Sequence, residues 1–174
     1  MANAADQPTH NLSGSEALKK LKEMAEKART CMFTTNLQHI PGNTRPMSLQ
    51  EVDENDGTLY FLSSTESEKN KDIAKDGRTA LTFQNDGKSE YLAVYGNAEI
   101  YTDQATKTKY WTDFANAWFE GKDDPTLSVI GIKPDSAHYW DTKDGKILAY
   151  MKMSYAALTG ADVDDGGVEG KMAL

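Results

Sequence analysis

The spacing of apolar residues near the start of the chain is helical. Leucine and alanine residues recur at three- and four-residue steps between positions 18 and 28, which places them on one face of an α-helix. Ser13 and Glu16 stand three residues apart just before this stretch, as in a capping box, where the two side chains satisfy free N–H groups of the first turn. The pattern predicts a helix over about residues 14–29, with a capping box at its start.

From residue 30 the pattern changes to β-branched, aromatic and alternating residues, divided by short segments rich in Gly, Asn and Asp. Such a pattern is typical of strands joined by tight turns. Asn85-Asp86-Gly87 is a strong hairpin signal, and Gly96 inside a long strand predicts a bulge or sharp bend. Further helices are expected over about 68–75 and 104–119. Strands are expected over 31–35, 46–52, 59–62, 79–83, 91–101, 127–132, 137–140 and 147–150.

The order of these elements predicts the fold class. Strands follow one another along the chain instead of alternating regularly with helices, so we expect a mainly β (α+β) fold, an antiparallel barrel with helical insertions. The polar residues 1–12 are expected to be a disordered arm, and residues 13–158 a single domain. Residues 159–174 lack periodicity and are expected to be a flexible tail.

Composition narrows the range of partners and compartments. The chain of 174 residues has a net charge of −8, which argues against a surface for nucleic acid or an anionic membrane. No apolar run of about 18 residues is present, so no membrane span is expected. Cys31 is the single cysteine, so no intrachain disulfide can form, and a reducing, cytoplasmic location is expected.

Neither the cysteine nor the histidines indicate a metal site. Cys31 is interpreted as a small buried hydrophobe, and a redox-sensing thiol is the alternative. His10, His39 and His138 are far apart in sequence and lack the spacing of ligands on one helix face. We therefore predict no metal site.

Three polar features stand out against this acidic background. Arg45 begins a strand, the strand over 59–62 ends in Ser63 and Ser64, and Ser67-x-Lys69 opens the helix over 68–75. Hydroxyl and ammonium groups at a helix start favour an anion, and a guanidinium can bind a phosphate in a forked geometry. Together these features indicate a planar ligand anchored by a phosphate.

The order of several motifs carries a family resemblance. The motifs are, in chain order, Arg45-Pro46-Met47-Ser48, Tyr60-Phe61-Leu62-Ser63, Ser67-x-Lys69-x-x-Asp72-Ile73, Gly96 in a long strand, Trp118-Phe119-x-Gly121 and His138-Tyr139-Trp140-Asp141. With these motifs the chain resembles, over about residues 13–160, the general stress proteins of the pyridoxamine 5'-phosphate oxidase-like superfamily. This resemblance implies a six-stranded antiparallel split β-barrel with flanking helices that binds FMN, and a homodimer.

The resemblance also implies a set of cofactor-binding residues. Arg45 is expected near the phosphate or ribityl chain, Ser67 and Lys69 at the phosphate, and the strand ending in Ser64 along the ring. Trp118 and Trp140 are expected near the flavin of a partner subunit, with simple packing as the alternative. FMN is the expected cofactor, and FAD, another flavin such as a deazaflavin, or haem remain alternatives. The full set is Arg45, Pro46, Met47, Ser48, Phe61, Leu62, Ser63, Ser64, Ser67, Lys69, Trp118 and Trp140.

One departure from the oxidases limits the expected reaction. Pyridoxamine phosphate oxidases carry a C-terminal motif with Arg and His that grips the substrate phosphate, whereas residues 160–166 contain no Arg. Oxidation of vitamin B6 is therefore not expected. No pair of nucleophile and base is visible, and none is needed where a flavin carries the chemistry. We expect a stress-related flavin-dependent oxidoreductase acting on a small molecule at the dimer interface, or alternatively a protein that binds and sequesters flavin without turnover.

Overall fold

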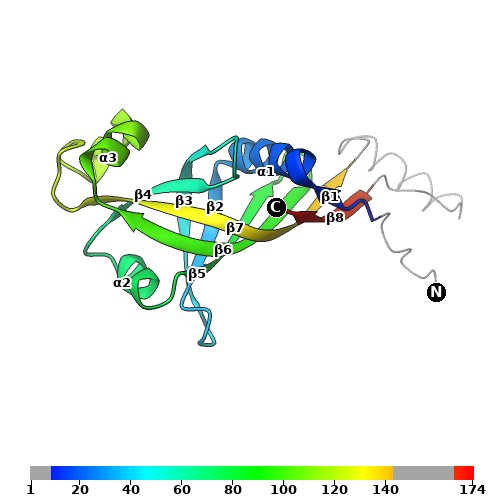
Figure 1. The fold of residues 1–174 in the computed structure, drawn as a ribbon, viewed down its shortest axis with the longest axis horizontal. Helices are drawn as coiled ribbons and strands as arrows, with labels where there is room; N and C mark the ends of the chain where they lie inside the picture. Colours follow the sequence, from blue (N-terminus) through cyan, green and yellow to red (C-terminus); the bar gives the residue numbers. More distant parts are fainter. Residues whose placement is uncertain (1–8, 143–166) are drawn as a thin grey trace, which may run out of the picture.

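The computed structural model of this chain describes residues 9–142 and 167–174 (Figure 1). The helical elements are α1 (Gly14–Ala28), α2 (Glu68–Lys75), α3 (Gln104–Tyr110) and a 3-10 turn (Asp113–Ala117). The strands are β1 (Leu12–Ser13), β2 (Thr30–Thr35), β3 (Asn43–Val52), β4 (Leu59–Ser64), β5 (Arg78–Asn85), β6 (Glu90–Tyr101), β7 (Leu127–Thr142) and β8 (Gly167–Ala173).

Six of the strands close into a barrel. They are hydrogen-bonded in the order β7-β4-β3-β2-β5-β6, and β6 pairs back onto β7. Every pairing in this ring is antiparallel. The expected six-stranded antiparallel barrel is confirmed, and so is the hairpin predicted at Asn85-Asp86-Gly87, which joins β5 to β6.

The long pair β6–β7 runs the length of the molecule in Figure 1 and bends at Gly96. The register of this pair shifts between Tyr95 and Gly96, where a Cβ on Gly96 would lie 2.3 Å from the carbonyl oxygen of Lys133. Gly96 faces Pro134 across the pair, so a proline is tolerated where the ladder is already irregular. The predicted bend is confirmed, and the two strands predicted over 127–132 and 137–140 are one continuous strand.

The core fills the barrel and extends under α1. Side chains of β4 alternate between buried and half-buried positions, and Phe61 meets Phe33 edge to face at 5.4 Å between ring centroids. The apolar face of α1, with Leu21 and Met24 buried, packs on this core as the helical spacing predicts. Cys31 is buried in the same cluster.

Two local predictions about helices are wrong. The side chain of Ser13 forms no capping hydrogen bond, so the capping box is not made. The helix predicted over 104–119 is interrupted, because α3 ends at Tyr110 and a separate 3-10 turn begins at Asp113. Within this stretch Tyr110 is buried, whereas Phe114 and Trp118 are largely exposed.

The predictions for the chain ends are wrong within the described residues. Gly167–Ala173 forms β8, antiparallel to β7, instead of a flexible tail. Residues 9–12 are not a disordered arm, because Thr9 bridges to Glu169 and Leu12 pairs in parallel with Met172. Pairing with β7 orders this Gly-rich segment, and a single sequence does not reveal such a pairing. The rest of the arm and tail, and the predicted strand over 147–150, lie outside the described residues.

Candidate functional site

A cavity of about 440 Å³ lies between β3, β4 and the segment that follows α3. Its walls are apolar and hydroxyl-bearing, and Lys69 carries the one charge among the lining residues. The lining comprises Pro46, Met47, Ser48, Gln50, Leu62, Ser63, Ser64, Lys69, Thr112, Phe114, Ala115, Trp118, Phe119 and Thr126.

The strand wall of the cavity follows from the two-residue period of β-strands. Pro46, Ser48 and Gln50 alternate along β3 with residues that face the barrel interior, such as the buried Leu49. On β4, Leu62 and Ser64 alternate in the same way with buried neighbours. Because side chains of one parity share a face, the outward residues of two adjacent strands form one continuous wall.

A lip formed by residues 112–119 makes the opposite wall. Phe114 and Trp118 pack edge to face with ring centroids 5.3 Å apart, and 72% and 67% of their surfaces are exposed. Ala115 is buried and anchors the turn, and Thr112 Oγ1 donates to Gln50 Oε1 on β3 at 3.4 Å. Large exposed aromatic groups beside a cavity are typical of a binding surface.

The segment after the lip is fastened to α3 by polar contacts. The buried Lys107 donates from Nζ to the carbonyl oxygen of Asp124 at 2.8 Å. Gln104 donates to Asp123 Oδ1 at 2.6 Å. The Asp124 carboxylate in turn accepts from Thr126, the residue immediately before β7. The lip is therefore held at both ends.

Lys69, in the first turn of α2, supplies the positive charge of the cavity. The side chain is half-buried, and burial together with the charge of Arg45 lowers the pKa of Lys69 below its ordinary value. Among the described residues Lys69 makes no hydrogen bond or ion pair. An ammonium that is partly desolvated and lies close to another cation is stabilised by an incoming anion.

Arg45 lies behind Lys69 and is partly neutralised. Its Nη1 donates to Thr35 Oγ1 at 2.7 Å, and Nη2 lies 3.8 Å from Asp72 Oδ2. Burial lowers the pKa of Arg45, and the carboxylate of Asp72 opposes this shift. Arg45 does not line the cavity, although it contributes to the local positive potential.

The hydroxyl groups of Ser63 and Ser67 are used within the protein. Ser67 is the N-cap of α2, and its hydroxyl accepts from the backbone N–H of Asn70. The same hydroxyl donates to the carbonyl oxygen of Ser64 at 2.7 Å. Ser63 Oγ donates to Asn70 Oδ1 at 2.7 Å. A hydroxyl that caps a helix stabilises that helix whether or not a ligand is bound.

Eight of the twelve residues predicted for the cofactor site line this one cavity, and four do not. Arg45 and Ser67 lie beside it, as described above. Phe61 has a fully buried side chain in the barrel core. Trp140 stacks on His138 on β7, with centroids 4.3 Å apart and the planes 5° from parallel. Contact of Trp140 with a partner's flavin stays a prediction, whereas Trp118 lines the cavity of its own chain.

Sequence reasoning missed six lining residues. Gln50 continues the two-residue period of Pro46 and Ser48, so the strand pattern alone would have found it. Phe114 and Phe119 flank Trp118 in the sequence, and their aromatic character was a usable signal. Thr112, Ala115 and Thr126 reach the cavity only through the folding of the lip, which no local pattern indicates.

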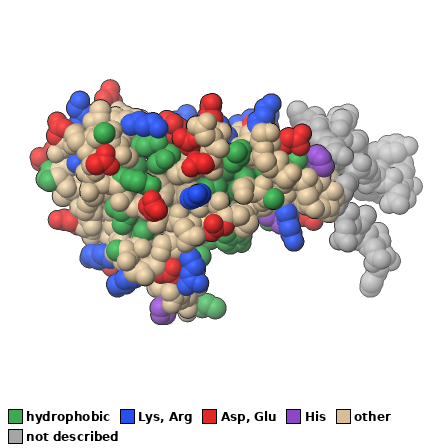
Figure 2. All heavy atoms as spheres, viewed as in Figure 1, with side chains coloured by type: hydrophobic (Ala, Val, Ile, Leu, Met, Phe, Trp, Pro, Cys, Tyr) green, Lys and Arg blue, Asp and Glu red, His purple; other side chains and the backbone are tan. Residues whose placement is uncertain are grey.

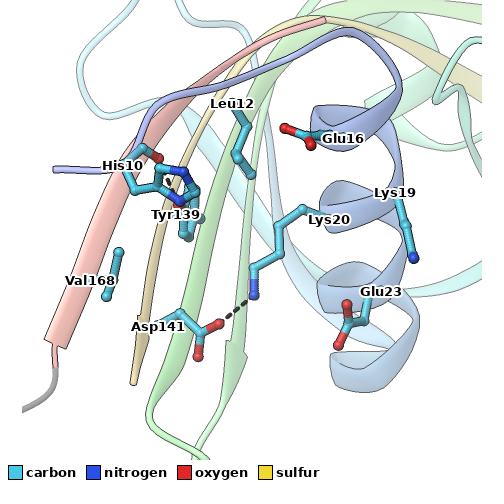
Figure 3. Close-up of a pocket in the computed structure, with 9 residues that line it drawn as sticks. All are labelled: His10, Leu12, Glu16, Lys19, Lys20, Glu23, Tyr139, Asp141 and Val168. Carbon is cyan, nitrogen blue, oxygen red and sulfur yellow. Dashed lines mark hydrogen bonds and ion pairs between the residues drawn. The ribbon is translucent and has the colours of Figure 1, made fainter. Parts of the chain in front are cut away.

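A second cavity, of about 350 Å³, lies between α1 and the end of β7 (Figure 3). Lys20 is paired with Asp141 inside it, and Glu16, Lys19 and Glu23 add both signs of charge. It contains none of the predicted site residues. Because three acidic and two basic side chains are mixed in its lining, the cavity favours no particular class of ligand.

On the face in Figure 2, basic and acidic side chains are interspersed, without a single basic field. None of the described helices is long and apolar enough to cross a membrane. Within residues 9–142 and 167–174 no group of three or more His, Cys, Asp or Glu side chains could hold a metal ion. A cytoplasmic location stays a prediction.

Comparison with known proteins identifies the family of this chain. A sequence profile described as pyridoxamine 5'-phosphate oxidase like matches residues 16–164. The chain belongs to this family. The resemblance to general stress proteins of the family, and the split-barrel fold that it implies, are confirmed.

Individual relatives agree with this placement. The chain is 30% identical to protein bli-3 of Neurospora crassa over 142 residues, covering 75% of this chain and 62% of the relative. It is 32% identical to general stress protein 26 of Bacillus subtilis over 81 residues, covering 45% and 58%. The chain thus spans about three fifths of the length of these curated relatives. The solved structure of the general stress FMN/FAD binding protein from Xanthomonas citri has the same fold, with a TM-score of 0.65 and 23% identity over 76% of this chain and 94% of that one.

Proposed function

We propose that this family member binds FMN in the cavity between β3, β4 and the lip, with the phosphate beside Lys69. The observation that carries the proposal is the half-buried ammonium of Lys69, which has no partner among the described residues and lies next to Arg45. In a chain with a net charge of −8, two adjacent cations at a cavity favour an anionic group.

The rest of the cavity suits a flat heterocycle. A volume of about 440 Å³ is within the range of small-molecule sites, roughly 300–1,000 Å³. Pro46, Leu62 and the aromatic lip provide apolar walls, and Gln50 and Ser64 provide polar groups for a ring edge. A bound flavin would supply electron and hydride transfer. The role of the protein residues is to hold the phosphate and to shield the ring from water.

We also propose that the chain acts as a homodimer that is closed by the outer face of β2, β5 and β6. The outward side chains over 30–34, 80–84 and 91–95 carry no charge, and Met32, Tyr91 and Tyr95 are exposed among them. An uncharged face with exposed Met and Tyr is typical of protein interfaces. Met32 is the cross-strand neighbour of Pro46, which lines the cavity, so a partner on this face would border the flavin.

We favour a flavin-dependent oxidoreductase that acts on a small molecule at this interface. The lip supports this view, because Phe114 and Trp118 leave an apolar surface beside the ring site. The second candidate is a protein that binds and sequesters flavin without turnover. Anaerobic mixing of the flavin-loaded protein with NADH or NADPH separates the two: bleaching of the flavin absorbance supports the oxidoreductase, and bleaching only by dithionite supports sequestration.

Fluorescence titration with FMN, FAD and riboflavin tests the ligand. We expect FMN to bind most tightly, and Lys69→Ala to weaken FMN about tenfold or more while riboflavin binding changes little, since a charge-assisted hydrogen bond is worth about 1.5–3 kcal/mol. Lys71→Ala is the matched control, because Lys71 lies on the same helix but is exposed and paired with Glu68. Equal FMN affinity for both variants would place the phosphate elsewhere.

Light scattering coupled to size-exclusion chromatography tests the dimer. We expect the mass of two chains for the native protein and of one chain for Tyr95→Glu, since a buried unpaired carboxylate opposes association. Ala105→Glu is the control, because it adds the same charge at an exposed position of α3, away from this face. A Tyr95→Glu variant that keeps the dimeric mass would exclude this face as the interface.

A further inference from the structure

A buried polar network joins the first turn of α2 to the strands under the cavity. At its centre is Asn70, only 4% exposed. The Asn70 side chain accepts from Ser63 Oγ at 2.7 Å and donates from Nδ2 to Ser128 Oγ at 2.9 Å. Ser63 and Ser128 are themselves buried and face each other across the β4–β7 pair. One side chain of the helix is therefore bonded to two barrel strands.

The polarity of the hydrogen bonds determines the orientation of the Asn70 amide. Ser128 Oγ donates its single proton to the carbonyl oxygen of Ser63 at 3.0 Å, so this hydroxyl can only accept from Asn70. The amide nitrogen must then face Ser128, and the amide oxygen faces Ser63 and Ser67. With the amide reversed, the Ser128 proton would turn to the amide oxygen, and the Ser63 carbonyl would lose this donor. In this orientation the amide oxygen accepts from Ser63 and the amide nitrogen donates to Ser128.

The neighbour of Asn70 along the helix is Lys69, the cation of the cavity. Lys69 has no hydrogen bond or ion pair within the described residues, so its own contacts do not fix its position. The backbone of this first turn is held instead by Asn70 and by the N-cap Ser67, to which the backbone N–H of Asn70 donates at 3.4 Å. Ser67 Oγ also lies 3.0 Å from Asn70 Oδ1.

We propose that Asn70 is a positioning residue for anion binding: its buried amide holds the first turn of α2 on strands β4 and β7 and so directs the ammonium of Lys69 into the cavity. The proposal rests on the proposed binding of FMN, because the anion is taken to be its phosphate. Asn70 does not line the cavity and acts only through Lys69. It therefore affects the part of the binding energy that depends on the phosphate.

The ratio of the dissociation constants of riboflavin and FMN measures that part, because the two ligands differ only in the phosphate. We expect Asn70→Ala to lower the ratio about threefold or more. In a Lys69→Ala background the same substitution should leave the ratio unchanged, since the group that Asn70 directs is absent. This double-mutant cycle tests action through Lys69.

A loss of stability alone would not produce this result. Ile73→Ala is the matched control, because Ile73 is a buried apolar anchor on the same helix outside the polar network. It should lower the melting temperature without changing the ratio. Ser128→Ala removes one partner of the Asn70 amide and leaves the helix sequence unchanged. It should lower the ratio as Asn70→Ala does, and it provides the test if Asn70→Ala folds poorly.

Each outcome has a distinct meaning. A native protein that binds riboflavin and FMN equally well, or neither, would overturn both the proposed function and the role of Asn70. A ratio that falls in Lys69→Ala but not in Asn70→Ala or Ser128→Ala would overturn the role of Asn70 alone. An equal fall in Ile73→Ala would do the same, because general loosening of α2 would then explain the effect.

Discussion

The rings of Tyr60 and Tyr110 stack with their centroids 4.1 Å apart and their planes at 18°. Tyr60 belongs to β4, and Tyr110 is the last residue of α3, immediately before the segment that leads into the lip. Lys109 Nζ lies 4.7 Å from the centroid of the Tyr110 ring and donates to its hydroxyl at 2.9 Å. The stack therefore holds the end of α3, just before the cavity lip, against β4.

Replacing Tyr110 by Ala should destabilise the protein and loosen the lip. Tyr110 is buried, and truncation of a buried aromatic residue to Ala lowers the free energy of unfolding by about 3–5 kcal/mol. We also expect weaker binding of any ligand that rests on Phe114 or Trp118. Urea unfolding measures the first effect. Tyr110→Phe keeps the stack and should remain within about 1.5 kcal/mol of the native protein; similar stability of Tyr110→Ala and Tyr110→Phe would show that the stack contributes little.

Local sequence patterns predict the parts of this fold that local chemistry determines. The β2–β3 hairpin, α2 and the bend at Gly96 each have their own signal: alternation, a Ser at the helix start, or a glycine within a strand. β8 has no such signal, because Val168 and Met172 are separated by Gly and charged residues. Its order comes from pairing with β7, which is a contact between distant parts of the chain.

The same distinction applies to the candidate site. Pro46, Ser48, Leu62 and Ser64 were predicted from the family resemblance of their motifs, and the structure places them together because they share one face of two adjacent strands. The lip was not predictable in its true form, because Tyr110 at the end of α3 packs on Tyr60, some 50 residues earlier in the chain. Ser67 marked the start of α2, but the sequence does not show that its hydroxyl caps the helix instead of reaching a phosphate.

The closure of the barrel at Gly96 gives a second prediction. A Cβ at this position would lie 2.3 Å from the carbonyl oxygen of Lys133 and 3.0 Å from Pro134 Cα. Both are backbone atoms that cannot move independently. Gly96→Ala should lower the free energy of unfolding by about 1–3 kcal/mol through overpacking. In Gly87→Ala, the nearest atom to the new Cβ is a side-chain oxygen at 3.4 Å in an exposed turn, so this control should unfold like the native protein. Equal urea midpoints for the two variants would contradict the predicted strain.

The thiol of Cys31 should be inert in the folded protein. It is 2% exposed, and burial raises the pKa of the thiol to about 12, so the reactive thiolate is scarce at neutral pH. We expect Ellman's reagent to react with native protein only as fast as the protein unfolds, and at once in denaturant. Rapid stoichiometric reaction under native conditions would instead favour the redox-sensing interpretation of Cys31.

Asp72 should make the stability of the protein depend on pH in the acid range. Its carboxylate accepts from Asn43 and Thr35, and these hydrogen bonds, with a smaller contribution from Arg45, lower the pKa of Asp72. The folded pKa therefore lies below the unfolded value of about 3.9. The stabilisation is fully present above that value and is lost as pH falls through the folded pKa.

The Asp72→Asn variant tests this assignment. Its unfolding free energy in urea should lie below that of the native protein by a constant amount from neutral pH down to about pH 5. The difference should shrink below about pH 4, where Asp72 becomes protonated in the unfolded chain before it does so in the native protein, and it should vanish once the native carboxylate is protonated as well. A difference that stays the same across this range would show that loss of the charge is not what destabilises the variant.

The lowered pKa of Lys69 predicts how flavin affinity changes at alkaline pH. The protonated amine binds the phosphate, so the pKa of Lys69 must be higher in the complex than in the free protein, where burial and Arg45 lower it. As pH rises through the free-protein pKa, affinity for FMN should fall by up to tenfold per pH unit until the pKa of the complex is reached. Riboflavin affinity should not show this fall, and titration of the shared ring cancels in the ratio of the two affinities.

The measurement is a pair of fluorescence titrations from pH 7.5 upward, where the phosphate, with a second pKa of about 6, is already doubly charged. Lys69→Arg keeps its charge throughout this range, so its ratio should stay flat, and Lys69→Ala should show a low ratio at every pH. Because the pKa of Lys69 is lowered, the fall in the affinity ratio should begin at a lower pH than the ordinary pKa of an exposed lysine would predict. A native ratio that is independent of pH up to the ordinary lysine range would mean that the phosphate does not contact this ammonium.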